Sequence, residues 1–131
     1  MKHTNRTYFA PQLFIKKGTR DISFYEKAFG AIERMKLTND DGSIHVAELA
    51  IDDTIFHLHE ETSDPLHFNP QKHNGTTVII GLFVPDVDAV MSKAITAGAV
   101  VASPAQSYDY GYRQGEVIDP FGHVWMIEMK I

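Results

Sequence analysis

The chain has 131 residues, of which 44% are hydrophobic and 22% charged, and it contains no cysteine. These proportions are typical of one folded domain and exclude a disordered tail protein. The absence of cysteine excludes disulfides, thiolate metal sites and a cysteine nucleophile. The formal net charge is −5 and no run of Lys and Arg exceeds a pair, so nucleic acid is not expected as a partner. The longest apolar run, 78–84, is far shorter than the roughly 20 residues of a membrane span. We therefore expect a cytoplasmic protein without a membrane partner.

The first half of the chain predicts a strand, a helix and three further strands. Residues 7–15 are rich in aromatic and branched side chains, and Pro11 marks an edge or a bulge there. Residues 19–29 carry apolar side chains at helical spacing and are followed by Gly30, a typical helix stop. Alternating apolar segments then predict strands at 31–38, 44–51 and 54–60.

The same order of elements recurs after a polar connector at 61–75. Residues 76–84 predict a strand, and residues 86–97 predict a helix that starts at Pro85-Asp86 and stops at Gly98. Three more strands are expected at 100–105, 115–118 and 123–130.

A common offset supports an internal duplication. Gly30 and Gly98, Glu48 and Glu116, and Glu60 and Glu128 are each separated by 68 residues. We therefore predict one α+β domain, 1–131, built from two βαβββ modules at about 7–60 and 76–131. Neither module can bury both faces of its sheet alone, so the concave side left over is the expected ligand site.

Several segments resemble the vicinal oxygen chelate superfamily, and within it the glyoxalase/bleomycin-resistance-like proteins of bacteria. These segments are 28–31, 45–49, 84–90, 97–99, and the closing motifs 110–113 and 119–125. The resemblance implies paired βαβββ modules that form a cupped mixed sheet, usually in a homodimer. It also implies either a divalent metal with a chelated substrate or a bound drug or metabolite. The Asp119-Pro120-Phe121-Gly122 segment itself fits a structural type I turn.

Metal-using members of that superfamily place one ligand on the first and one on the last strand of each module. The corresponding places in this sequence are Ala10, His57, Ile79 and Glu128. Ala10 and Ile79 cannot bind a metal, so the resemblance leaves His57 and Glu128 as metal ligands. Strand alternation adds His59 to the face of His57, and either His59 or Gln12 would have to complete a site. We expect no firmly held cofactor, only a weakly bound divalent metal at most. For both histidines the first interpretation is polar cavity lining or a surface pair without metal, and the alternatives are metal ligation and a direct hydrogen bond to the ligand.

Tyrosines alternate in the segment before the last strands. Tyr108, Tyr110 and Tyr112 could wall a pocket for an aromatic ligand or form an ordinary row of rings across strands. A turn at Gly111 would allow Arg113 to join them and offer its guanidinium to an anion. By contrast, His45 and Glu48 lie three apart on one strand and should point to opposite faces.

Three functions from different classes follow from these residues. The leading hypothesis is a homodimeric protein that binds a planar or aromatic small molecule without a full metal site. Its cavity would be lined by Gln12, His57, His59, Ile79, Tyr110, Tyr112, Arg113 and Glu128. The alternative is a metal-dependent lyase, isomerase or dioxygenase that acts on a substrate with adjacent oxygens, with Glu128 as the catalytic proton shuttle. A dimeric interaction module without a ligand is the third possibility.

Overall fold

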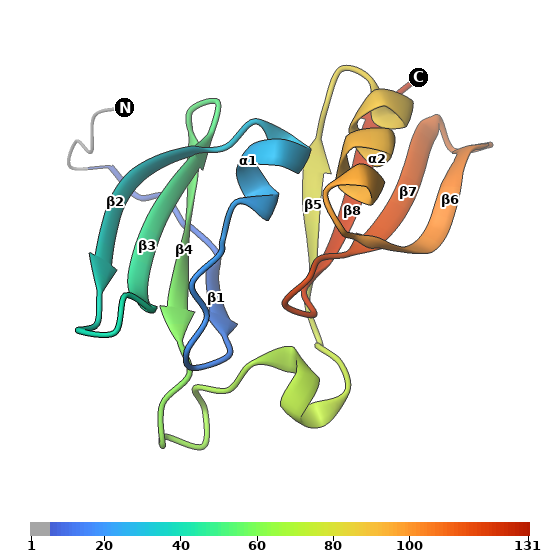
Figure 1. Cartoon of the computed structure of the whole chain (residues 1–131). Coiled ribbons are helices and arrows are strands. Elements are labelled where there is room, and N and C mark those ends of the chain that lie inside the picture. Colours follow the sequence, from blue (N-terminus) through green and yellow to red (C-terminus); the bar gives the residue numbers. More distant parts are fainter. Residues whose placement is uncertain (1–5) are drawn as a thin grey trace.

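Two four-stranded sheets enclose two helices in the computed structural model, which describes residues 6–131 (Figure 1). The first sheet has the strand order β1-β4-β3-β2, and the second has the order β5-β8-β7-β6. Within each sheet the first and last strands of the module run parallel and the other neighbours run antiparallel. This identical order in both halves confirms the predicted α+β fold of tandem βαβββ modules.

The first module consists of β1 (Gln12–Ile15), α1 (Phe24–Phe29), β2 (Ile32–Thr38), β3 (Ile44–Ile51) and β4 (Thr54–Glu60). A short 3₁₀ helix, η1 (Pro70–His73), lies in the connector. The second module consists of β5 (Ile79–Phe83), α2 (Val87–Thr96), β6 (Val100–Tyr108), β7 (Tyr112–Ile118) and β8 (Val124–Lys130). No helix in this described part of the chain combines the length and apolarity that crossing a bilayer requires.

The ends of several elements differ from the sequence expectation for local reasons. β1 begins only at Gln12, because the preceding Pro11 has no N–H to donate to a neighbouring strand. α1 begins only at Phe24, because the side chain of Asp21 accepts hydrogen bonds from the N–H and hydroxyl of Ser23 and holds a turn there. β6 and β7 are longer than predicted and continue to the hairpin at Gly111, where φ is +90°. Glycine adopts that backbone conformation without strain.

The core lies where the helix-covered faces of the two sheets meet. Tyr25 of α1 packs against Phe56 of β4 and Trp125 of β8, with ring centroids 5.2 and 5.8 Å apart. Phe56 and Trp125 are themselves 5.5 Å apart, so a single core joins both modules. Phe56 and Trp125 therefore lie on the helix-covered sides of their sheets.

The other face of each sheet points away from this core and carries no helix. On the first sheet this open face exposes the apolar side chains of Met35 and Leu37 of β2. On the second sheet it exposes Ile79 and Phe83 of β5. Gln12, His57 and His59 lie on the open face of the first sheet, and Glu128 lies on that of the second.

Candidate functional site

Four polar side chains meet on the open face of the first sheet. Gln12 of β1 and Glu48 of β3 lie on either side of His57 of β4, because strand pairing places both directly opposite it. The ring of His57 contacts Glu48 through Nε2, 3.0 Å from Oε1, and Gln12 through Nδ1, 3.2 Å from Oε1. His59 places its Nε2 2.5 Å from the same Gln12 oxygen. We call Gln12, Glu48, His57 and His59 the His57 group.

The contact with Gln12 assigns the ring proton of His59. An amide oxygen only accepts, so Nε2 of His59 donates to Oε1 of Gln12. Partial burial is the main cause that lowers the pKa of His59 below its usual value, and the positive charges of the nearby His57, His45 and His67 are smaller causes in the same direction. His59 is therefore the neutral tautomer near pH 7, with Nδ1 as an acceptor.

Glu48 is the member of this group that sequence reasoning left without a defined role. Its place follows from the two-residue turn at Asp52-Asp53, which pairs Glu48 directly with His57. As predicted, His45 points to the other face, where its Nδ1 lies 2.8 Å from the Glu60 carboxylate. The register of the β3–β4 hairpin would have placed Glu48 beside His57 from the sequence alone.

A second hydrogen-bonded group lies on the open face of the second sheet. The hydroxyl of Tyr110 donates to Oε1 of Gln114 at 2.5 Å, and Nε2 of Gln114 donates to Oε1 of Glu128 at 2.8 Å. The Glu128 carboxylate lies over Gly81 of β5; a Cβ atom there would be 2.7 Å from Oε2 of Glu128. Gly81 and Gln114, both missed in the sequence, thus allow Glu128 to lie 92% buried on an open face. We call Tyr110, Gln114 and Glu128 the Glu128 group.

A row of aromatic rings borders the Glu128 group. Tyr108 and Tyr110 are stacked with centroids 5.3 Å apart, and Tyr112 lies 5.7 Å beyond Tyr110. Phe83 of β5 extends the row at 6.1 Å from Tyr112. Tyr110 and Phe83 are 63% and 57% exposed, so their faces are available to another flat molecule. These four residues form the aromatic row.

Arg113 does not join this row. Its side chain points to the helix-covered side of β7, where Nε and Nη2 donate to the two carboxylate oxygens of Asp88 at 2.9 and 2.8 Å. The hydrogen bonds from Arg113 hold the pKa of Asp88 below its usual value. The Gly111 turn comes one residue before β7 starts, so strand alternation alone decides the direction of Arg113.

The sites predicted from sequence therefore separate into two sets within one chain. Gln12, His57 and His59 lie on the first sheet, whereas Ile79, Tyr110, Tyr112 and Glu128 lie on the second. Both sheets turn their helix-covered sides to the common core, so these two open faces point away from each other (Figure 1). Within a single chain these two sets of residues therefore lie apart. The cavity expected from the sequence is that of a homodimer, and it stays a prediction.

The residues of one chain do not fit a metal centre. Imidazole and carboxylate are suitable ligands, but His57 and Glu128 lie on different sheets and Ala10 and Ile79 offer no donor atom. Within residues 6–131 no three His, Asp or Glu side chains are arranged to hold an ion together. We therefore derive no chemistry through a metal from this chain alone.

Comparisons with known proteins agree with this fold. Residues 4–127 match the family model described as the glyoxalase/bleomycin resistance protein/dioxygenase superfamily. An uncharacterized protein of Mycobacterium bovis, Mb0911c, is 35% identical over 125 residues, which cover 93% of this chain and 82% of that protein. The crystal structure of the Arabidopsis thaliana At5g48480 product has a TM-score of 0.70 at 28% identity, covering 93% of this chain and 98% of that one. TioX from Micromonospora sp. ML1 also has a TM-score of 0.70, at 23% identity, with 95% and 97% coverage.

Proposed function

The chain belongs to the glyoxalase/bleomycin resistance protein/dioxygenase superfamily, and we propose that it is a cytoplasmic binding protein for a planar or aromatic small molecule. The aromatic row beside the Glu128 group is the observation that carries this proposal. Two largely exposed rings, Tyr110 and Phe83, offer flat apolar contact next to fixed hydrogen-bonding groups. Small-molecule sites combine the same elements: mostly apolar or aromatic walls and a few placed polar groups.

The residues around the aromatic row indicate which functional group the ligand carries. Tyr112 and Ile79 lie on the same open face as Glu128, and Gln114 holds the Glu128 carboxylate in place. His59, neutral near pH 7, offers Nδ1 as an acceptor for a hydroxyl or a protonated acid. An aromatic compound that carries an acidic or hydroxyl group matches this combination better than a small aldehyde conjugate.

We propose that the binding protein is a homodimer. Each chain exposes the His57 group and the Glu128 group on faces that point apart, and each face also carries exposed apolar side chains. A second copy can bring the His57 face of one chain against the Glu128 face of the other. A stable interface of this kind buries on the order of 2,000 Å² or more in total. The ligand would then lie between Gln12, His57 and His59 of one copy and Ile79, Tyr110, Tyr112 and Glu128 of the other.

Removing one ring of the aromatic row should weaken ligand binding. We expect a thermal-shift screen to find aromatic acids or planar compounds first, and Tyr110→Ala to bind the best of them at least fivefold more weakly, the scale of a lost aromatic contact. Phe9→Ala is the matched control, because Phe9 is 96% exposed and lies outside the row. Unchanged binding in Tyr110→Ala and Tyr112→Ala, together with lost activity of Glu128→Gln on a thiol conjugate, would favour the enzyme hypothesis instead.

The metal-dependent enzyme is the competing function, and metal content separates the two. With only His57 and Glu128 at the four ligand places, any divalent ion should be lost on dialysis, because it lacks the compact set of ligands that catalytic zinc needs. Elemental analysis of protein made without a His tag should therefore find far less than one metal per chain. Near one metal per chain after dialysis, lost in His57→Ala, would contradict the binding-protein proposal and support a lyase, isomerase or dioxygenase.

A further inference from the structure

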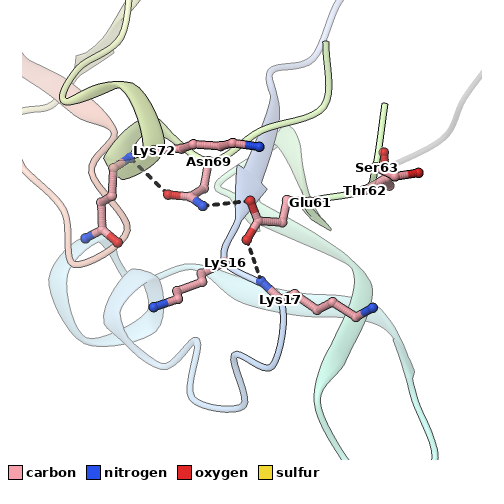
Figure 2. Close-up of a pocket in the computed structure, with 8 residues that line it drawn as sticks. Lys16, Lys17, Glu61, Thr62, Ser63, Asn69 and Lys72 are labelled. Atoms are coloured by element: carbon pink, nitrogen blue, oxygen red, sulfur yellow. Dashed lines mark hydrogen bonds between the residues drawn. The ribbon is translucent and has the colours of Figure 1, made fainter. Parts of the chain in front are cut away.

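A polar cleft of about 600 Å³ lies outside both the His57 group and the Glu128 group. It forms where the chain leaves β1 and β4 and meets the connector (Figure 2). Three lysines surround it together with polar residues: Lys16, Lys17, Glu61, Thr62, Ser63, Asn69, Gln71 and Lys72. We call this the lysine cleft.

The floor of the lysine cleft is held by hydrogen bonds. Glu61 accepts from the backbone N–H of Lys17 at 3.2 Å and from Nδ2 of Asn69 at 2.9 Å. Asn69, which is 5% exposed, also accepts from the N–H of Gln71 and so fixes the start of η1. The hydrogen bond from Lys17 is the largest cause of the lowered pKa of Glu61, so this carboxylate stays ionised. The cleft therefore has a floor fixed by hydrogen bonds and three long lysine side chains around it.

The charge of the lysine cleft opposes that of the whole chain. The formal net charge of the chain is −5, yet this cleft carries three lysines against the single carboxylate of Glu61. Both oxygens of Glu61 are already hydrogen-bonded to other groups, and none of the ion pairs between described residues involves Lys16, Lys17 or Lys72. Figure 2 shows their ammonium groups on different sides of Glu61. Separated positive charges suit a ligand with several separated negative charges better than a single compact anion.

We propose that the lysine cleft binds a small molecule that carries several phosphate groups. Its volume lies within the range of small-molecule sites, roughly 300–1,000 Å³. Lysine is a common phosphate ligand that acts as a point charge, and the Thr62 and Ser63 hydroxyls at the rim can donate to phosphate oxygens. The inference does not depend on the proposed function, because no residue of the cleft belongs to the His57 group or the Glu128 group.

Titration calorimetry with inorganic tripolyphosphate and orthophosphate tests this proposal. At low salt we expect saturable binding of tripolyphosphate, weaker binding of orthophosphate, and a marked loss of affinity when the salt concentration is raised. Lys16→Met and Lys72→Met should each weaken tripolyphosphate binding roughly fivefold, the scale of one charged hydrogen bond at an exposed site. Lys93→Met is the matched control, since Lys93 lines a separate shallow depression between the helices. Comparing ATP with tripolyphosphate distinguishes recognition of a nucleotide from recognition of the phosphates alone.

Glu61→Gln gives a readout that a purely structural cleft would not show. This variant removes the one negative charge at the floor. It keeps an acceptor for the N–H of Lys17 and gives up the one for Nδ2 of Asn69, and with the charge removed tripolyphosphate should bind severalfold more tightly. Absence of saturable binding at low salt would overturn the proposal. Equal losses in Lys16→Met, Lys72→Met and Lys93→Met would overturn it as well, because they would indicate general attraction to surface lysines.

Discussion

Replacing Asp119 by alanine should lower the free energy of unfolding by about 3 to 5 kcal/mol, the scale of losing a buried hydrogen-bond network. Asp119 is only 3% exposed and accepts four hydrogen bonds. One carboxylate oxygen accepts from the hydroxyl of Tyr25 at 2.5 Å and from Nε1 of Trp125 at 2.9 Å. The other accepts from the backbone N–H groups of Phe121 and His123. Alanine would leave these buried donors without partners.

Urea denaturation followed by the fluorescence of Trp125, the single tryptophan, measures this effect. Asp86→Ala is a suitable control: Asp86 also accepts a backbone N–H, from Ala89, but it caps α2 at the surface, where the loss should be about 1 kcal/mol. Tyr25→Phe should also cost less than Asp119→Ala, because only one of the four donors is removed. Burial raises the pKa of Tyr25 well above its usual value, so its hydroxyl remains a donor at all ordinary pH values. Equal losses in Asp119→Ala and Asp86→Ala would contradict this account of the network.

The role of Asp119 illustrates what a local motif can and cannot predict. The Asp-Pro-Phe-Gly segment predicted a type I turn, and the N–H of Gly122 does donate to the carbonyl of Asp119 at 3.0 Å. The long-range bond to Tyr25, 94 residues away, could not be predicted from that turn. It depends on how α1 packs against β8, which is a property of the complete core.

The fold was predictable because its evidence is distributed along the whole chain. The 68-residue offset relates helix stops and strand residues in both halves, and alternation within strands is a local property of the backbone. Strand alternation therefore placed His57 and His59 on one face. It did not indicate that the two sheets turn their open faces apart, since nothing local encodes which sides of the sheets share a core.

Pairing between strands explains the site residues that were missed or misplaced. Glu48 lies opposite His57 and Gln114 lies opposite Glu128, so both follow from hairpin register rather than from any motif. Arg113 was placed beside the tyrosines by assuming that the Gly111 turn would redirect it. Asp88 of α2 instead holds its guanidinium on the covered side of β7. Such a partner on another element is visible only once the modules are packed.

If the ligand lies between two copies of the chain, two variants with substitutions on different sheets should form intact binding sites when they are combined in one dimer. Gln12→Ala/His57→Ala alters only the first sheet, and Tyr110→Ala/Tyr112→Ala alters only the second. Each double variant alone should bind the best aromatic acid more weakly. We expect roughly thirtyfold for Tyr110→Ala/Tyr112→Ala, which loses two ring contacts, and roughly tenfold for Gln12→Ala/His57→Ala, which loses polar contacts. After the two are unfolded together and refolded as an equal mixture, about a quarter of the normal number of tight sites should return. Only a mixed dimer combines an intact first sheet with an intact second sheet.

Light scattering and titration calorimetry measure the two parts of this expectation. The wild-type chain and both double variants should have twice the chain mass of 14.7 kDa at micromolar concentration, which shows that assembly survives the substitutions. A mixture made without unfolding controls for exchange of subunits, because dimers that stay intact should regain no tight sites. A stable 14.7 kDa wild-type monomer would contradict the dimer. If the proteins are dimers but their refolded mixture regains no tight sites, the ligand binds on one sheet of one chain instead. The aromatic row would then be the remaining candidate site, because its exposed rings need no second copy to stack on a flat molecule.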